Sequence, residues 1–434
     1  MVEHRGLSVA FVSSWYPRVC GIATFTEHSA SAIRLYEDDI RQIRIHPIDI
    51  DGLYYNDPVM EKHIIHQLDS SSWTNAAHMI IARYHRNSAE GIRSVAVLEH
   101  EYGLDGNGRD NNYNEIAKRL KQAKVPNIVV LHTVLDNPEP YHRDVIRQFG
   151  ENCDRLITIS SSSREILEQV YGIPGEKISL IRHGIPETHK AVSRQEAKRK
   201  LGLTDRIVVS TLGLVSENKG IEYGLEGFSQ FLEQVSPVDK KKLVYVIAGQ
   251  THPEILKRHG WTDPYRERLI ELATRLGLNP ATVDKPQPLD KPDSNAIFVN
   301  RYLMENELVE TIKASDVILL PYINPQQDSS GNLAYAIGLG SAVVATKFRG
   351  AKDLFTDKRG RPDGSGVMVD FKNSTEIAKG LRNAFENHRE LERKSYVKGV
   401  TMGWSVVGRE LVNVLRDVVE EQSGVESPEI SFVR

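Results

Sequence analysis

The chain has 434 residues, of which 40% are hydrophobic and 26% are charged. This is the composition of a globular protein with enough apolar material for a packed core, and the length favours two or more domains. The formal net charge of −3 excludes the overall basic field that would point to nucleic acid, and the two cysteines, Cys20 and Cys153, are too few for a disulfide framework.

The sequence contains no stretch that approaches 18 consecutive apolar residues, so no transmembrane segment is predicted. The first apolar run, Leu7–Val12, is also too short for the hydrophobic region of a signal peptide. We therefore expect a cytoplasmic protein. Peripheral contact with a membrane stays open, because an amphipathic surface does not need a long apolar run.

Short apolar runs alternate with helical patterns in the first part of the chain. Helical periodicity predicts helices over Thr24–Leu35, Asn112–Gln122 and Arg164–Tyr171. Runs of Val, Ile and Leu predict buried strands at Leu7–Val12, Ile43–Ile48, Ser94–Leu98, Asn127–Leu131, Arg155–Ile159 and Ile178–Ile181. Continuous apolar strands separated by helices are typical of a parallel sheet that is covered on both faces.

The alternation restarts after a polar and basic stretch. The second series of predicted strands is Ile207–Leu212, Leu243–Ala248, Ala296–Val299, Val317–Leu320, Ala342–Ala345 and Gly366–Val369. Two such series predict an α/β protein of two doubly wound domains that face a central cleft. The predicted boundaries are 1–186 for the first domain, 187–203 for a linker, 204–388 for the second domain, 389–421 for a helical segment that returns to the first domain, and 422–434 for a tail.

Polar residues follow the predicted strands of the first domain. Arg18 and Gly21 lie in the loop after the first strand, where a glycine lets backbone approach a ligand and an arginine can hold an anion. His132 directly follows the strand Asn127–Leu131 and can serve as a hydrogen-bond donor or as an acid or base. A solvated arginine and a histidine satisfied at the sheet edge are the plain alternatives.

The segment Glu99-His100-Glu101-Tyr102 ends another predicted strand. Adjacent residues rarely converge on one metal ion, so no metal site is predicted here. Polar contacts to a hydroxylated substrate fit this composition better. The alternative is a surface loop with ordinary ion pairs.

The stretch from Asp316 to Ala336 predicts an anion site. A short strand closes at Pro321, and Ser329, Ser330, Gly331 and Asn332 then open a helix. The unpaired backbone N–H groups at such a helix start favour a negative charge. In the second domain Lys219 also lies just before a predicted helix, where its point charge suits a phosphate, although a solvated loop lysine explains it too.

Together these motifs resemble the retaining glycosyltransferases of family 4, which have the GT-B fold of two Rossmann-like domains. The resemblance extends from Val9 to about Leu415 and rests on the segments Pro17–Phe25, Ile181–Gly184, Leu214–Ile221, Asn300–Leu303, Ser315–Tyr322 and Gly340–Thr346. It implies transfer of a hexosyl group from a nucleotide-sugar to a carbohydrate or other hydroxyl acceptor. The anomeric configuration would be retained, and no metal or other cofactor would be needed.

The resemblance also implies roles for single residues. His132, Lys219 and Gln327 would be catalytic, with His132 near the transferred sugar and Lys219 on the donor diphosphate. The donor or phosphate set would be Arg18, Gly21, Ile22, Lys219, Ser329, Ser330, Gly331, Asn332 and Leu333, several of them through backbone. The acceptor or sugar contacts would be Glu99, His100, Glu101 and Tyr102, and the nucleotide side would hold Arg301, Tyr302 and Tyr335.

The chain departs from the family at three of these positions. Leu214 replaces the arginine that precedes the phosphate lysine, and Gln327 and Tyr335 replace two glutamates. Gln327 can still bind a sugar hydroxyl, whereas Tyr335 cannot act as a carboxylate toward a ribose. Two alternatives therefore stay open: a glycoside phosphorylase on the same fold that uses inorganic phosphate or a sugar 1-phosphate, and a non-catalytic GT-B domain that binds a glycan or a protein.

Overall fold

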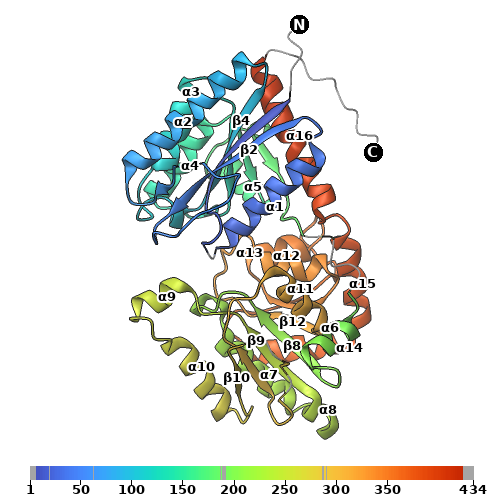
Figure 1. Ribbon diagram of the computed structural model, residues 1–434. Coiled ribbons are helices and arrows are strands. Elements are labelled where there is room, and N and C mark those ends of the chain that lie inside the picture. Colours follow the sequence, from blue (N-terminus) through green and yellow to red (C-terminus); the bar gives the residue numbers. More distant parts are fainter. Residues whose placement is uncertain are drawn as a thin grey trace. The chain divides into compact units, whose positions relative to one another are not determined.

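The computed structural model describes residues 6–18, 20–61, 63–185, 187, 192–285, 288–289 and 291–423. The chain divides into two compact units, of which unit 1 comprises Met1–Gly184 with Trp404–Arg434 and unit 2 comprises Ile185–Gly403. Each unit is built on a sheet of seven parallel strands with helices on both faces (Figure 1). Two doubly wound α/β units were predicted from the alternating pattern.

The sheet of unit 1 has the strand order β3-β2-β1-β4-β5-β6-β7. Its strands are β1 (Leu7–Ser13), β2 (Ile40–Asp49), β3 (Ile65–His66), β4 (Arg93–His100), β5 (Asn127–Leu131), β6 (Arg155–Thr158) and β7 (Ile178–Leu180). The helices are α1 (Gly21–Tyr36), α2 (Ser70–Ala89), α3 (Asn112–Gln122), α4 (Pro140–Asn152), α5 (Ser161–Gln169) and α16 (Trp404–Ser423), with 3-10 turns η1 (Tyr102–Leu104) and η2 (Gly175–Lys177).

Alternate residues of the unit 1 strands point into two different cores, as the two-residue period of a strand requires. Ala10 and Val12 of β1 pack with Trp73 of α2 on one face, to which α3 and α4 also contribute. Val9 and Phe11 of the same strand pack on the other face against α1 and α16. Figure 1 shows α16, drawn in red, running beside α1 in blue. The C-terminal helix is thus part of the core of unit 1.

The sheet of unit 2 has the order β10-β11-β9-β8-β12-β13-β14. Its strands are β8 (Ile207–Leu212), β9 (Leu243–Ala248), β10 (Ala281–Val283), β11 (Ala296–Val299), β12 (Val317–Leu320), β13 (Ala342–Thr346) and β14 (Val367–Val369). The helices are α6 (Arg194–Leu201), α7 (Ile221–Leu232), α8 (Pro237–Lys242), α9 (Pro253–Arg258), α10 (Pro264–Arg275), α11 (Glu305–Ala314), α12 (Gly331–Gly338), α13 (Arg349–Phe355), α14 (Ser374–Glu386) and α15 (His388–Gly399), with the 3-10 turn η4 (Glu217–Lys219). Helices α11, α12 and α13 cover one face, and α7, α10 and α14 cover the other.

Both sheets reverse their winding direction at one central strand pair. The chain winds outward from β1 and β4 in unit 1, and from β8 and β12 in unit 2, where β11 alone returns to lie between β9 and the edge strand β10. In an open α/β sheet the carboxyl ends of the strands beside such a switch point form the usual ligand site. These two places are therefore where functional side chains are to be sought.

Two predicted segment boundaries differ from the structure. The stretch 187–203 was predicted as a linker, but its later half forms α6, which packs on α11 inside unit 2. The segment 389–421 was predicted to return to the first domain as a whole, but it is broken at residues 400–403. Helix α15 belongs to unit 2 and only α16 belongs to unit 1. The periodic apolar pattern continues through the break, which is why the sequence did not separate the two helices.

Part of the predicted tail, residues 424–434, lies outside the described residues. Cys20 and Cys153 are both free thiols. Across the helices that the structure describes, none is both long and apolar enough to span a bilayer.

Candidate functional site

Four polar side chains meet at the switch point of unit 2, at the carboxyl ends of β8 and β12. Lys219 Nζ donates a hydrogen bond of 2.9 Å to the hydroxyl of Tyr322. That hydroxyl also lies 3.1 Å from Ser330 Oγ and 3.4 Å from Asn332 Nδ2. Asn332 Nδ2 in turn donates to the carbonyl of Leu212 at the end of β8, at 2.7 Å. We call Lys219, Tyr322, Ser330 and Asn332 the switch-point cluster.

Two glycines allow these segments to come so close. Gly213 has φ +93°, and a Cβ placed there would lie 2.6 Å from Asn332 Nδ2. Gly220 has φ +59°, and a Cβ there would lie 2.2 Å from the carbonyl oxygen of Pro321. Neither the left-handed backbone nor the space admits a larger residue. The loops after β8 and β12 are therefore held in contact by backbone that only glycine provides.

The start of α12 supplies free backbone donors to this cluster. Ser330 is the N-cap, and its Oγ accepts a hydrogen bond of 3.3 Å from the N–H of Leu333. The N–H groups of Gly331 and Asn332 have no acceptor among the residues that the structure describes. Unpaired amides, the positive end of the helix dipole and the ammonium of Lys219 together favour an anion.

Tyr322 is the centre of the cluster. Its side chain is buried, its ring stacks on Phe348 with centroids 5.0 Å apart, and Lys219 Nζ lies 4.3 Å from its ring centroid. Burial alone would raise the pKa of the Tyr322 phenol, but the charge and hydrogen bond of Lys219, with Ser330 and Asn332, hold that pKa below its ordinary value. The phenol oxygen therefore acts as a fixed acceptor that positions the ammonium of Lys219.

The other predicted donor-side residues make contacts within the protein. Gln327 Nε2 donates to the carbonyl of Ser329 at 2.7 Å, which holds the loop before α12. Arg301 is paired with Glu307 at 2.8 Å. Tyr335 is buried, and its hydroxyl donates to the carboxylate of Glu305 at the start of α11.

In unit 1 the structure pairs two of the predicted residues at the switch point. His132 Nε2 lies 2.7 Å from Glu99 Oε2, and these side chains are 9% and 1% exposed. The ring of Phe25 packs on the imidazole at nearly a right angle, with centroids 5.1 Å apart. In the described part of unit 1, no hydrogen-bond partner is found for His132 Nδ1. Glu99 thus orients the imidazole and leaves one ring nitrogen for a ligand.

His100 and Tyr102 do not lie with Glu99, although we predicted all of them as acceptor or sugar contacts. The side chain of His100 is fully buried, and its ring packs against Tyr102, Tyr113 and Phe149. Burial lowers the pKa of His100 to about 3, so the ring is neutral. Successive residues of a strand point to opposite faces, so His100 enters the core when Glu99 faces His132. In this structure neither His100 nor Tyr102 is accessible to a sugar.

The remaining predicted residues of unit 1 lie in the loop after β1 and near β5. Arg18 Nη1 donates to the carbonyl of Ile48 at 3.2 Å and to Gln67 Oε1 at 3.1 Å. Gly21 begins α1, and a Cβ there would meet nothing within 4 Å, so its backbone stays approachable; Ile22 follows it. Glu101 accepts a hydrogen bond of 2.7 Å from Thr133.

The sequence did not identify Tyr322 or Glu305 as site residues. Tyr322 directly follows Pro321, which closes the strand. Its position at this strand end, beside the switch point, was the signal that could have identified it. Glu305 had no such signal, because only the packing of α11 against α12 brings it to Tyr335.

Comparisons with known proteins agree with this architecture. Residues 113–189 match the family model described as Glycosyltransferase Family 4. An uncharacterised glycosyltransferase of Methanocaldococcus jannaschii is 24% identical over 281 residues, which cover 62% of this chain and 61% of the relative. The match thus spans about three fifths of the length of that curated relative.

Solved structures match almost the whole chain. Anabaena HepE in complex with UDP has a TM-score of 0.66 and 14% identity, and the match covers 94% of this chain and 100% of HepE. The chain has the GT-B fold. A sucrose-phosphate synthase from Thermosynechococcus elongatus has a TM-score of 0.69 and 14% identity, and the match covers 96% of this GT-B chain and 100% of the synthase chain. A glycosyltransferase from Rickettsia africae gives TM-score 0.69 at 12% identity, over 97% and 99% of the two chains. The predicted fold class and the resemblance to family 4 are confirmed.

Proposed function

We propose that the protein is a retaining glycosyltransferase that moves a hexosyl group from a nucleotide-sugar to a sugar or other hydroxyl acceptor. The switch-point cluster carries this proposal, because it offers a held ammonium and free helix amides where a GT-B unit binds an anion. HepE, which has the same fold, has been solved with UDP and with UDP-glucose. That likeness supports a nucleoside diphosphate as the anion.

The cluster would act on the leaving group. As the glycosidic bond to the donor phosphate breaks, negative charge gathers on the departing diphosphate. Lys219 and the N–H groups of Gly331 and Asn332 would stabilise that charge, and they are already oriented before the reaction. We assign no covalent nucleophile on the protein. That the reaction needs no metal or other cofactor besides the nucleotide-sugar stays a prediction.

In unit 1 we assign His132 to the transferred sugar. Its Nε2 is held by the Glu99 carboxylate, so Nδ1 would contact a sugar hydroxyl. Glu99 is then a positioning residue rather than a direct ligand, since its side chain is 1% exposed. Glu101, fixed by Thr133, stays a candidate acceptor contact. Cytoplasmic location stays a prediction.

A glycoside phosphorylase is the second candidate, because Gln327 and Tyr335 are not carboxylates. Against it stands Glu305, whose carboxylate accepts the hydrogen bond of Tyr335. A carboxylate is therefore present beside position 335 after all, supplied by α11 instead of α12. This contact favours a nucleotide over a bare phosphate.

The test is a melting experiment with UDP, GDP, ADP and inorganic phosphate, each in large excess. A ligand that binds only the folded protein raises Tm. At one hundred times its Kd it adds about 2.7 kcal/mol to the free energy of unfolding. We expect one nucleoside diphosphate to raise Tm in the wild type and to raise it less in Lys219→Met. The matched control is Lys379→Met, which removes an exposed lysine paired with Glu376 on α14.

Each outcome separates the candidates. A shift with phosphate alone would favour the phosphorylase. Equal shifts in the wild type and in Lys219→Met would remove the switch-point cluster from the proposal. No shift with any of the four compounds would favour the non-catalytic domain.

A further inference from the structure

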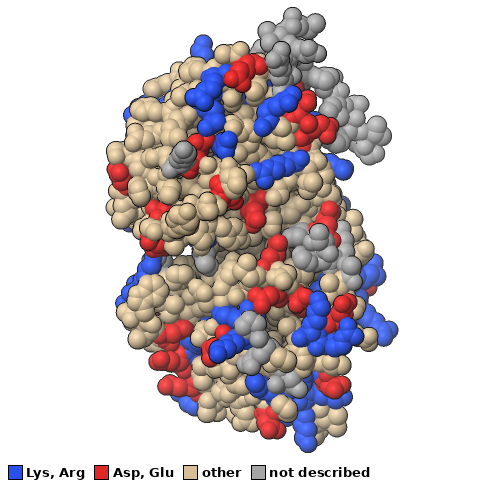
Figure 2. All heavy atoms as spheres, in the orientation of Figure 1, with Lys and Arg blue, Asp and Glu red and all other residues tan. Residues whose placement is uncertain are grey.

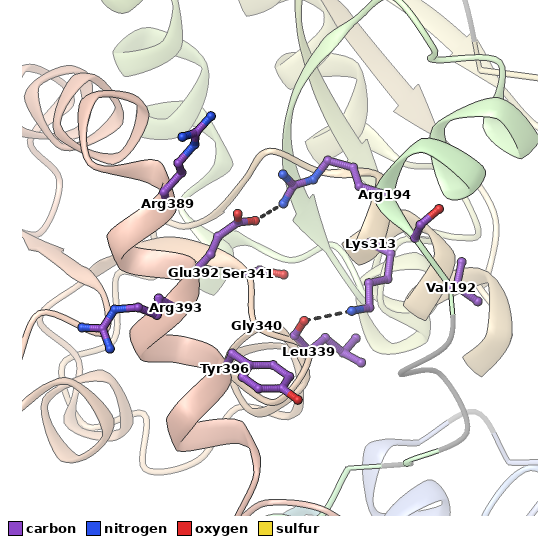
Figure 3. Close-up of a pocket in the computed structure, with 11 residues that line it drawn as sticks. Val192, Arg194, Lys313, Leu339, Gly340, Ser341, Arg389, Glu392, Arg393 and Tyr396 are labelled. Carbon is purple, nitrogen blue, oxygen red and sulfur yellow. Dashed lines mark hydrogen bonds and ion pairs between the residues drawn. The ribbon is translucent and has the colours of Figure 1, made fainter.

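Unit 2 has a concave site that the proposed function does not use. It is a pocket with a volume of about 510 Å³, lined by residues of α6, α11, α15 and the turn from α12 into β13 (Figure 3). Ser341 directly precedes β13, so the pocket lies at the amino end of this strand. The switch-point cluster lies at the carboxyl ends of the sheet. The volume is within the range of pockets that take small organic ligands.

The lining is cationic. It contains Arg194, Lys313, Arg389 and Arg393, against the single carboxylate of Glu392. Figure 2 shows Lys and Arg side chains gathered on unit 2 where Figure 1 places α6 and α15. A concave surface lined mainly by one sign of charge concentrates ligands of the opposite sign.

Two of the four cations are neutralised by the protein. Arg194 is paired with Glu392, as the dashed line in Figure 3 marks. Arg393 forms two hydrogen bonds with Glu390, at 2.9 and 2.8 Å. Within the described residues Lys313 and Arg389 have no carboxylate within ion-pair distance. Two uncompensated positive charges match a phosphate monoester, which carries about −1.5 to −2 at pH 7.

Lys313 points into the pocket and is sheltered there (Figure 3). Its Nζ donates to a neutral group, the carbonyl of Leu339, at 3.0 Å. Burial and, after it, the charge of Arg194 lower the pKa of the Lys313 ammonium. A bound anion would relieve both effects.

Ser341 adds a hydroxyl donor to the lining of the pocket. The residue is only 4% exposed, and no partner for its hydroxyl is found in the described part of the chain. Figure 3 shows this hydroxyl inside the ring of lining residues. A phosphate oxygen in the pocket would accept a hydrogen bond from this hydroxyl.

The lining also provides an apolar wall. The ring of Tyr396 is on the pocket and the residue is 59% exposed, with Leu339 beside it. Inorganic phosphate would fill only part of this volume and would leave the ring uncovered. A sugar phosphate would place its ring carbons there and its phosphate near Lys313 and Ser341.

We propose that this pocket binds a phosphorylated small molecule of sugar size and acts as an effector site. The pocket touches Leu339 at the end of α12, and the switch-point cluster includes Ser330 and Asn332 at the start of the same helix. An eight-residue helix, about 12 Å long, links the two. The effector role rests on the proposed function, whereas binding to the pocket does not.

The test is calorimetric titration of the full chain with glucose 6-phosphate as the probe, and with glucose and inorganic phosphate as separate arms. We expect glucose 6-phosphate to bind, glucose not to bind, and phosphate to bind more weakly. Lys313→Met and Arg389→Gln should each weaken binding about tenfold or more. Arg389→Gln breaks no contact found among the described residues, so it separates loss of binding from loss of folding.

Two further variants locate the binding. Lys219→Met in the switch-point cluster and Lys379→Met on exposed α14 should bind the probe as the wild type does. Binding that persists in both pocket variants but is lost in Lys219→Met would place the probe in the switch-point cluster and overturn the proposal. If phosphate binds as tightly as glucose 6-phosphate and this binding is lost in Lys313→Met, the ligand is inorganic phosphate. That result would overturn the proposal of a ligand of sugar size.

The effector role has its own measurement. The Kd of UDP, or of whichever diphosphate raises Tm, should change at least threefold when glucose 6-phosphate saturates the pocket, and this change should vanish in Lys313→Met. An unchanged Kd would overturn the effector role and leave the pocket as a binding site. If no diphosphate binds but glucose 6-phosphate still binds to the pocket, the proposed function fails and the binding site stands.

Discussion

Tyr322→Phe is the substitution that most directly tests how the switch-point cluster works. It removes the hydroxyl that accepts the 2.9 Å hydrogen bond from Lys219 Nζ. The ring keeps its stacking on Phe348 and its place beneath the ammonium, 4.3 Å from Nζ. The charge of Lys219 is untouched, so the variant changes how firmly that charge is held, and it also removes the longer contacts of the hydroxyl with Ser330 and Asn332.

The expected loss follows from the kind of contact that is removed. A hydrogen bond to a charged group contributes about 1.5–3 kcal/mol. The lower end applies here, because the ring still attracts the cation and water can replace the hydroxyl. A loss of about 1.4 kcal/mol corresponds to tenfold weaker binding of the diphosphate. Lys219→Met removes the charge itself and should cost more, about 1.5–3 kcal/mol or roughly 10–150-fold.

The assay is a double-mutant cycle on the Kd of UDP, or of the diphosphate that raises Tm. If Tyr322 acts through Lys219, the double variant binds no worse than Lys219→Met alone. The matched control is Tyr265→Phe, which breaks a 2.8 Å hydrogen bond to Glu222 in the first turn of α7 but no contact with Lys219, and should leave the Kd unchanged. Strictly additive losses, or wild-type affinity in Tyr322→Phe, would refute the idea that Tyr322 positions the ammonium.

Three further substitutions test unit 1. Glu99→Gln keeps a hydrogen bond to His132 but not the charge, so kcat should fall about tenfold with KM little changed; a raised KM at constant kcat would contradict a positioning role. Burial raises the pKa of Asp105 to about 6 from 3.8, so the folded protein holds this proton more tightly and stability is lost as pH rises through this interval. Urea titrations should show a loss of up to about 3 kcal/mol in the wild type and none in Asp105→Asn. Burial would raise the pKa of the Glu37 carboxyl, but Arg416 on α16 holds it below its usual 4.5, so this pair stabilises unit 1 above about pH 4.5 and fails in acid. Glu37→Gln should cost about 1–2 kcal/mol at pH 7 and nothing once the wild-type carboxyl is protonated; equal losses at both pH values would disprove the charge pair.

The sheets were predictable because their strands are buried on both faces. The long runs of Val, Ile and Leu, such as Asn127–Leu131 or Val317–Leu320, became strands within a residue or two of the predicted ends, except that β2 starts three residues before the predicted Ile43. The strands that escaped prediction, β3 and β10, have two and three residues and no comparable apolar run. Helix starts were less predictable; α5 begins at Ser161, three residues before the apolar pattern, because Ser160 caps it.

The site residues were only partly predictable, since a sequence shows which side chains end a strand but not where they point. Glu99 and His100 are neighbours, yet one orients His132 and the other fills the core. Lys219, Ser330 and Asn332 were predicted as phosphate contacts from their local context. What connects them is the hydroxyl of Tyr322, and the contact between residues so distant in sequence exists only because β8 and β12 are adjacent in the sheet.

The contact of Glu305 with Tyr335 bears on how missing motif residues should be interpreted. The sequence lacks a carboxylate at position 335, and this was the main reason to consider a phosphorylase. In the folded chain α11 places a carboxylate on the hydroxyl of that same residue. A ligand responds to the groups within hydrogen-bond reach and not to the helix that carries them. The missing carboxylate at position 335 therefore describes one position in the sequence. It argues against nucleotide binding only if Glu305 also cannot reach the nucleotide.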